Sequence, residues 1–406
     1  MTKDPSRVRV RGPLKPFAPG FVEWLKAHGY RPLSAAFQLN LLAHWSRWLT
    51  RHRRDLRRLS MMDVERFLTA RRRAGYTQYL SPKAMAPMLA SLSEQGVVVA
   101  PRPAPPLGPV DAALACYHQY LVQERGLGHA TARGYVEAVR SFVRARVTPD
   151  RLTLNWASLD AADVMTFVVR HTPQQSRGTA KLTVTALRSL LGFLHVEGLI
   201  ARPLTTAVPS VAGWRLAGLP KALQPTQVRA LLASCDRRTR SGRRAFAVIT
   251  LLLRLGLRAG EVAALRLDDI DWHAGTVVIR GKGPRVESLP WPADVGEAVV
   301  AYLRQGRPAT ASDRTVFVRV KAPHRALTSA GVTEIVAAAA RRAGLGVIHA
   351  HRLRHTAATQ LLRAGAPLPE IGQLLRHRRA LTTAIYAKVD RDTLRTIARP
   401  WVGGVA

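Results

Sequence analysis

The chain has 406 residues, of which 47% are apolar, so two or three domains with buried cores are expected. Its formal net charge of +36 indicates a polyanionic ligand, and nucleic acid fits better than a membrane surface; the alternative is a solvated surface in an arginine-rich protein. Two widely separated cysteines, Cys116 and Cys235, argue against a disulfide scaffold or a thiolate metal site. No apolar signal segment follows the charged N-terminus, and the longest apolar run, 245–257, is too short for a bilayer, so we expect a cytoplasmic protein without membrane contact.

Two proline-rich segments, 100–109 and 201–225, are typical of linkers. They divide the chain into three parts, each long enough to hold a core of its own. We therefore expect domains at 1–105, 108–205 and 218–406.

The first two parts have the pattern of one helical unit present twice. An acidic residue opens a helix in each, Asp63 in the first and Asp163 in the second. The helices that follow keep a constant offset of 102 residues up to Gly96 and Gly198, which stand where a helix C-cap is expected. Apolar residues recur at helical spacing in both parts, which predicts two small helical bundles. A chance match between apolar helices is the alternative to a repeat.

Arginines are spread through these two parts. In 108–205 they are interspersed along one predicted helix, where they could face phosphates or simply solvent. In 1–105 they form the runs RHRRDLRR and RRR, the second at 71–73. These runs favour a DNA-binding module over the alternative, a protein-contact module.

The third part is mainly helical with one small sheet. Two β-branched runs flank Gly281-Lys282-Gly283, which predicts an antiparallel hairpin with Lys282 at an exposed turn. Helical patterns precede this hairpin and continue after it towards the end of the sequence.

A series of cationic side chains ending in a tyrosine carries the chemistry of this third part. Arginine binds phosphate oxygens bidentately, histidine donates hydrogen bonds, lysine can protonate a leaving oxygen, and a tyrosine hydroxyl can attack phosphorus. Together they suit phosphodiester chemistry without a metal. The candidates are Arg258 in LGLRAGE, Lys282 in RGKG, His351 and Arg354 in HRLRHT, His377 in LLRHRR and Tyr386 in AIYAKV.

If LLRHRR and AIYAKV are taken as one segment, these sequences form four boxes that, in this order, resemble those of the tyrosine recombinase (phage integrase) family over about residues 108–406. The resemblance implies a mainly α fold: two small N-terminal helical bundles of the SAM-like core-binding type, apparently duplicated, and then a mostly helical catalytic domain with one small antiparallel sheet. The part at 108–205 would be the core-binding DNA-binding domain and 218–406 the catalytic domain. The family has glycine before its last histidine, whereas Arg376 stands there in this chain, which bears on how His377 is presented.

The resemblance also implies roles for the candidates. Arg258 and Arg354 would clamp the non-bridging oxygens of the scissile phosphate, and Lys282 would be the general acid for the 5′-hydroxyl leaving group. Tyr386 would be the nucleophile; because a free phenol has a pKa of about 10, its cationic surroundings must stabilise the ionised form. The alternatives are that the arginines and the lysine are ordinary surface residues and that the tyrosine packs in a helix.

The histidines and one acid complete the set. His351 would bond the phosphate and assist proton transfer from the tyrosine, and His377 would add a further phosphate contact. Glu261, three residues after Arg258, would orient that arginine, or would be an ordinary surface acid. His355, one helical turn after His351, is better explained as a structural residue.

No metal or other cofactor is expected. His349, His351 and His355 lie close together in the sequence, but they have no carboxylate or cysteine nearby, and the interleaved arginines would repel a cation. Neither a Walker loop nor a dinucleotide fingerprint is present.

The resulting hypothesis is a site-specific recombinase or integrase of a mobile element that cleaves and rejoins DNA through a 3′-phosphotyrosyl intermediate. The expected partners are double-stranded DNA and three further copies of the chain, which would form a homotetramer on two DNA sites in the bacterial nucleoid. The alternatives are a Xer-like dimer resolvase, a type IB topoisomerase and a non-catalytic DNA-binding relative.

Overall fold

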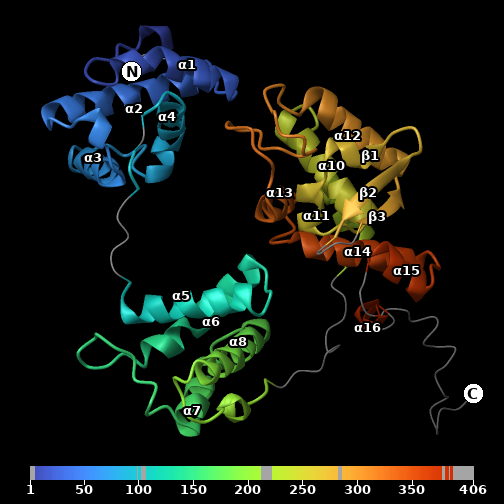
Figure 1. The fold of residues 1–406 in the computed structure, drawn as a ribbon. Helices are drawn as coiled ribbons and strands as arrows, with labels where there is room; N and C mark the ends of the chain where they lie inside the picture. The colour runs from blue at the N-terminus through green and yellow to red at the C-terminus, as the bar shows by residue number, and fades with distance from the viewer. Residues whose placement is uncertain are drawn as a thin grey trace, which may run out of the picture. The chain divides into compact units, whose positions relative to one another are not determined.

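A computed structural model describes most of the chain and is mainly helical (Figure 1). By contacts between Cα atoms the chain forms two compact units, one of residues 103–217 and one that combines 1–102 with 218–406. The division into three domains stays a prediction. The described residues are 5–97, 99–101, 107–211, 222–281, 286–376, 380–383 and 385–386.

The N-terminal residues form helices around a core of their own. The helices are α1 (Ala18–Ala27), α2 (Pro32–Arg51), α3 (Met61–Arg73) and α4 (Pro82–Glu94), with short 3₁₀ turns η1 (Pro5–Arg7), η2 (Lys15–Phe17) and η3 (Leu56–Arg58). Trp45 of α2 is fully buried, with its ring centroid 6.3 Å from that of Phe67 on α3. Aromatic burial of this kind stabilises a small bundle by a few kcal/mol, roughly 2–3 for each large side chain.

Residues 107–211 form a second helical bundle. It consists of α5 (Pro109–Gln123), α6 (His129–Arg144), α7 (Ala161–His171), α8 (Arg177–Val196) and the 3₁₀ turn η4 (Thr205–Ala207). Tyr117 of α5 is completely buried and donates a hydrogen bond of 3.1 Å to the Ala186 carbonyl of α8. Burial raises the pKa of this tyrosine, so it acts as a neutral anchor between the two helices.

The expected helix caps are present in both bundles. Asp63 and Asp163 each accept a hydrogen bond from the backbone N–H three residues earlier, at 3.1 and 3.5 Å. Gly96 and Gly198 follow the ends of α4 and α8 with φ of +85° and +71°. In each case the residue after the glycine donates to a carbonyl five residues earlier, at 2.9 Å, which is the Schellman arrangement. The prediction of C-cap glycines is confirmed.

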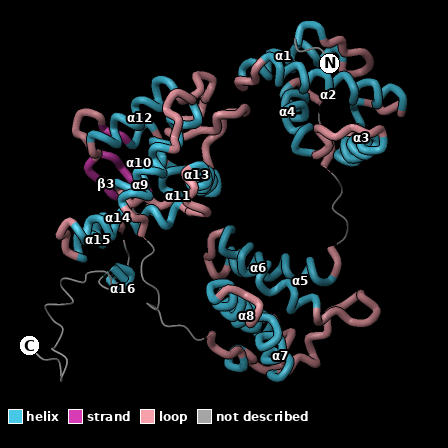
Figure 2. Tube along the Cα trace, turned by 180° about the vertical axis from the view of Figure 1, so that it is seen from behind, coloured by secondary structure: helices cyan, strands magenta, loops and turns pink. Residues whose placement is uncertain are grey.

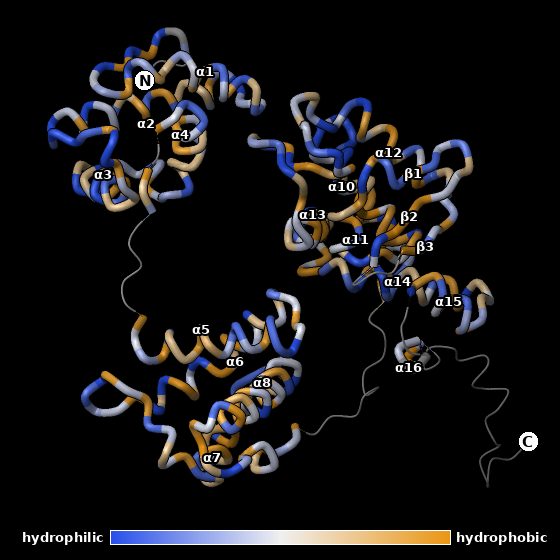
Figure 3. The backbone as a smooth tube through the Cα atoms, viewed as in Figure 1, coloured by the Kyte–Doolittle hydropathy of each residue, from blue (hydrophilic) through white to orange (hydrophobic). Residues whose placement is uncertain are grey.

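The third part packs helices around α10 (Figures 1 and 2). The helix α10 contacts α9, α11, α12, α13 and α14, and its residues 247–253 are all buried. Figure 3 shows hydrophobic stretches at the centre of this part. The bounds are α9 (Pro225–Ala233), α10 (Arg240–Arg254), α11 (Ala259–Ala264), the 3₁₀ turn η5 (Leu267–Asp269), α12 (Ala293–Gln305), α13 (Ser329–Arg342), α14 (Ala350–Arg363), α15 (Leu368–Leu374) and α16 (Ala380–Thr383).

One antiparallel sheet of three strands lies in the described residues of this part: β1 (Ile270–Asp271), β2 (Thr276–Arg280) and β3 (Val286–Pro290). Strands β2 and β3 pair from Thr276 with Pro290 to Arg280 with Val286, so the predicted hairpin is confirmed. Its turn residue, Lys282, lies outside the described residues. The mainly helical fold with one small sheet is likewise confirmed.

The helix α12 was not among the predicted elements. Its buried residues, Val295, Ala298, Val299 and Tyr302, have the spacing of one helix face. Among the helices that the structure describes, none is long and apolar enough to cross a membrane.

Candidate active site

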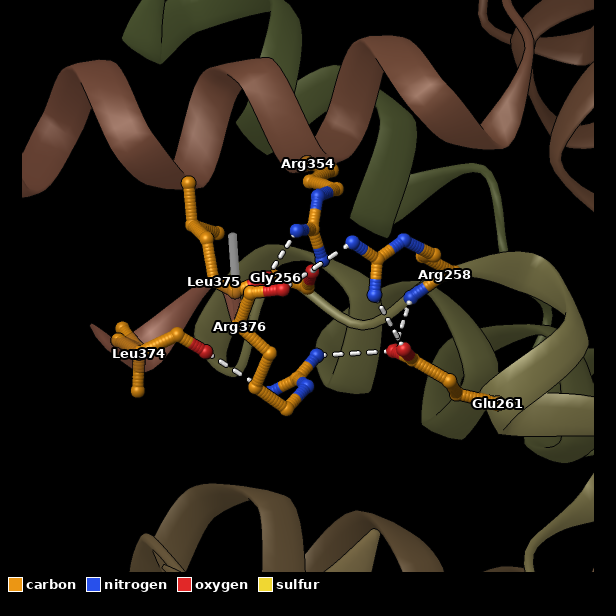
Figure 4. A network of polar contacts seen from close by, with 7 residues as sticks. All are labelled: Gly256, Arg258, Glu261, Arg354, Leu374, Leu375 and Arg376. Carbon is orange, nitrogen blue, oxygen red and sulfur yellow. Dashed lines mark hydrogen bonds and ion pairs between the residues drawn. The ribbon is translucent and has the colours of Figure 1, made fainter. Parts of the chain in front are cut away.

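Arg258 stands at the start of α11 and is held by the acid that follows it in that helix. Its backbone N–H donates to Glu261 Oε2 at 2.8 Å, and its Nη1 donates to Glu261 Oε1 at 2.6 Å (Figure 4). The arginine side chain remains 44% exposed, whereas that of Glu261 is only 5% exposed. The sequence RAGE therefore fixes the base of the guanidinium while its outer face can meet a ligand.

Glu261 is shared between two arginines. Arg376, which follows α15, places Nη2 2.8 Å from Glu261 Oε2, and this ion pair is almost completely buried. Burial raises the pKa of Glu261, but the hydrogen bond from the Arg258 backbone and the charges of Arg376 and Arg258 outweigh it, so the net pKa is below its usual value. The carboxylate is thus ionised at neutral pH and acts as a fixed counter-charge.

Arg354 of α14 is held by two backbone carbonyls. Its Nη1 donates to the Gly256 carbonyl at 2.6 Å, and its Nη2 donates to the carbonyl of Leu375 (Figure 4). The residue is 2% exposed. Burial, followed by the charges of Arg258 and Arg376, lowers the pKa of Arg354 to about 10, so the side chain keeps its charge at neutral pH. Among the described residues, these two carbonyls occupy two of its five N–H donors.

Gly256 allows this close approach. Its φ is +56°, a conformation that side-chain-bearing residues rarely adopt, and a Cβ at this position would lie 2.5 Å from Leu375 Cδ2. The glycine of LGLRAGE therefore brings the loop before Arg258 against the turn that follows α15.

Two histidines one turn apart on α14 connect the arginines to the tyrosine. The rings of His351 and His355 meet edge to face with centroids 4.5 Å apart. The Nδ1 of His355 lies 2.9 Å from the Tyr386 hydroxyl, and Tyr386 is 2% exposed. The hydroxyl therefore has a defined hydrogen-bond partner on the same helix that carries Arg354.

The ionisation states of these three side chains follow from burial and positive charge. Partial burial, followed by the charges of Arg354 and Arg258, lowers the pKa of His351. Burial, then His351 and Arg354, lowers the pKa of His355 to about 4, so this ring is neutral at pH 7. Burial raises the pKa of Tyr386 more than the charge of Arg354 lowers it, so the phenol keeps its proton in this structure.

The structure thus places five of the seven residues singled out from the sequence near one end of α14 and α11. Arg258, Glu261 and Arg354 form one network, while His351 and Tyr386 lie within electrostatic reach of its arginines. Lys282 and His377 lie outside the described residues.

Two further residues contact the site that were not assigned to it from the sequence. His355 was interpreted as structural, yet it contacts the Tyr386 hydroxyl, and its spacing of four residues from His351 was the available signal. Arg376 was noted only for replacing a glycine, and its partner Glu261 lies 115 residues away, beyond any local pattern.

The arrangement suits a phosphate. The guanidinium groups of Arg258 and Arg376 bind the Glu261 carboxylate, and that of Arg354 lies within its electrostatic reach, so the formal charge of the group is +3 − 1 = +2. Arginine forks bind phosphate oxygens strongly, and a neutral histidine next to a tyrosine hydroxyl can exchange a proton with it. In the part of the chain that the structure describes, no group of three or more His, Cys, Asp or Glu side chains is placed to hold a metal ion.

Comparisons with known proteins agree with this chemistry. Residues 221–392 match the model of the phage integrase family, and residues 114–198 match that of the phage integrase N-terminal SAM-like domain. A Sinorhizobium fredii protein provisionally named integrase/recombinase y4rA is 40% identical over 400 residues, 97% of this chain and 95% of its own length. The tyrosine recombinase XerC of Bacillus pumilus is 31% identical over 68% of this chain and 92% of its own length.

Solved structures share the fold at lower identity. One is XerH, crystallised bound to its palindromic difH substrate in a post-cleavage complex. It aligns with 70% of this chain and over 83% of the XerH chain, with a TM-score of 0.56 and 21% sequence identity. Another is a lambda integrase tetramer bound to a Holliday junction. It aligns with 79% of this chain and over 88% of the lambda integrase chain, with a TM-score of 0.54 and 15% sequence identity. This chain belongs to the phage integrase family and is an enzyme of the tyrosine recombinase type.

Proposed function

We propose that this enzyme is a site-specific DNA recombinase whose nucleophile is Tyr386. The tyrosine oxygen forms a bond to phosphorus as the bond from phosphorus to the 5′ oxygen breaks, which leaves a 3′-phosphotyrosyl link and a 5′-hydroxyl. The 5′-hydroxyl of a partner strand then attacks that link and releases the tyrosine. One phosphodiester replaces another of similar energy, so the exchange requires no ATP.

The observation that supports this assignment most directly is the grouping on α14. His351 and His355 stand one turn apart on this helix with Arg354 between them, and the Tyr386 hydroxyl lies 2.9 Å from His355 Nδ1. In the proposed reaction Arg258 and Arg354 neutralise the charge that develops on the phosphate, and His351 assists proton transfer from the phenol. Lys282 protonates the 5′ oxygen, and His377 adds a phosphate contact.

The DNA contacts of the rest of the chain are part of the proposal. Residues 108–205 would bind one side of the target duplex and 218–406 the other, and four copies on two DNA sites would exchange strands. The lambda integrase tetramer on a Holliday junction supports this assembly by likeness of fold alone.

For residues 1–105 we propose a further DNA contact. A surface hollow of about 400 Å³ lies between α2 and α3, with Arg47, Arg51 and the buried Arg71 in its lining. The Arg71 guanidinium lies 4.1 Å from the centre of the Tyr76 ring, which also lines the hollow. Cations beside an aromatic surface suit a nucleic-acid backbone, and the alternative is a contact with another protein.

We propose that the enzyme moves a mobile element, since the relative that matches nearly the whole chain carries the name integrase/recombinase. The test is recombination in vitro between the joined ends of the DNA segment that carries its gene and a target plasmid. Integration or excision of that segment supports the proposal. Recombination only between two copies of a chromosomal dimer site would instead favour the second candidate, a dimer resolvase, which the likeness to XerC suggests.

A further inference from the structure

Arg376 occupies a position that ought to be unfavourable for arginine. Its φ is +53°, in the left-handed region where only glycine is free of steric cost. Its side chain is also 4% exposed, so the guanidinium has lost most of its hydration. A glycine would avoid both costs, so the side chain must supply something in return.

Arg376 is linked to Arg258 through its own carbonyl and through Glu261. Its Nη2 lies 2.8 Å from Glu261 Oε2, and its Nη1 donates to the Leu374 carbonyl at 2.8 Å (Figure 4). Its own carbonyl accepts a bond of 3.4 Å from Arg258 Nη2, and the preceding carbonyl, of Leu375, accepts from Arg354. The turn after α15 therefore touches both arginines through its backbone and Glu261 through its side chain.

Glu261 has a different partner at each of its oxygens. The Oε1 atom pairs with the Arg258 side chain at 2.6 Å, whereas Oε2 receives the Arg258 backbone N–H and the Arg376 side chain, each at 2.8 Å. With Arg376 bound to Oε2, the carboxylate is turned so that a single oxygen faces the Arg258 guanidinium. Without Arg376, both oxygens could close on Arg258 in a bidentate pair.

We propose that Arg376 is a positioning residue that holds Glu261 away from a bidentate pair with Arg258 and so keeps the Arg258 guanidinium available to the scissile phosphate. The proposal rests on the proposed function. This effect acts on the phosphate through Arg258 and does not require Arg376 to touch DNA.

The test compares Arg376→Gly and Arg376→Lys with the wild-type full-length protein in single-turnover cleavage of a nicked duplex. Glycine suits the backbone at this position, so Arg376→Gly should fold and bind DNA as before while its cleavage rate falls about tenfold to a hundredfold, the scale of a misplaced catalytic group. Arg376→Lys, which keeps the charge, should recover part of the rate. The matched control is Arg363→Gln, at an exposed arginine in the last turn of α14, which also removes one positive charge and should cleave at the wild-type rate.

A double-mutant cycle shows whether Arg376 acts through its partner. In a Glu261→Gln background, Arg376→Gly should change the rate by less than about threefold, because the carboxylate that Arg376 turns is absent. Wild-type cleavage by Arg376→Gly, no recovery with lysine, or equal losses in both backgrounds would each overturn the proposal.

A crystal structure of Arg376→Gly tests the proposal independently of DNA cleavage. We expect Glu261 to place both oxygens on the Arg258 guanidinium, and unchanged side chains there would also overturn the proposal. If the wild type forms no adduct with DNA, the proposed function fails, and this structure still decides whether Arg376 controls the Glu261–Arg258 pair.

Discussion

The lowered pKa of His355 predicts that the free energy of unfolding of the protein falls as the solution becomes acidic. The pKa of His355 is about 4 in the folded protein, because of burial and then the charges of His351 and Arg354, whereas an unfolded histidine has a pKa of about 6.5. The folded state therefore favours the neutral ring. The stability that depends on the neutral ring is present above pH 6.5, is lost as the pH falls towards 4, and changes no further below that.

The size of the effect follows from the two pKa values. A separation of about 2.5 pKa units corresponds to a loss of roughly 3.4 kcal/mol in the free energy of unfolding once the ring is protonated in both the folded and the unfolded state. About 2.5 kcal/mol of that is lost by pH 4.5. Because the ring is only half buried, solvent screening reduces the expected loss to about 1 kcal/mol.

The perturbation is His355→Asn, which leaves an uncharged group near the position of Nδ1 and removes the titration. We expect the variant to be nearly as stable as wild type at pH 7 and to lose about 1 kcal/mol less between pH 6.5 and 4.5. Urea unfolding of both proteins at a series of pH values measures the difference, and other acid-sensitive groups such as Glu261 cancel in the comparison. Parallel loss of stability in the two proteins would refute the assignment of a neutral, half-buried His355.

Two further predictions concern the packing before Arg258 and the N-terminal module. Gly256→Ala should destabilise the protein by about 1–3 kcal/mol, because its Cβ would meet Leu375 at 2.5 Å, whereas Gly260→Ala, where nothing lies within 4 Å, should leave the melting temperature nearly unchanged. If both variants melt together, the close approach is misassigned. Replacing Arg47 and Arg51 by glutamine should weaken DNA binding and lower the slope of log affinity against log salt by about two; an unchanged slope, measured by fluorescence anisotropy, would favour a protein partner for the hollow.

Much of the fold could be predicted from local patterns in the sequence. The hairpin at 276–290 and the glycines after α4 and α8 were predictable because turn chemistry and helix caps depend on residues a few positions apart. The helix α12 has the same kind of signal, in the spacing of Val295, Ala298, Val299 and Tyr302, and could have been found.

The site was predictable only in part. Arg258 and Glu261 are three residues apart and meet within the first turn of one helix, so their contact follows from spacing. The pairing of Arg376 with Glu261 and that of His355 with Tyr386 join segments 115 and 31 residues apart, and only the folded chain brings them together. A left-handed φ at an arginine is likewise invisible in the sequence, since it is imposed by the packing around the turn.

The most direct test of Tyr386 as the nucleophile is covalent trapping on a nicked duplex that carries the candidate recombination site. Wild type and Tyr386→Phe are incubated with end-labelled DNA in EDTA and separated on a denaturing gel. A protein–DNA band from wild type alone is the expected result, and it would also locate the cleaved phosphate. No band despite intact DNA binding, or equal bands from both proteins, would contradict it.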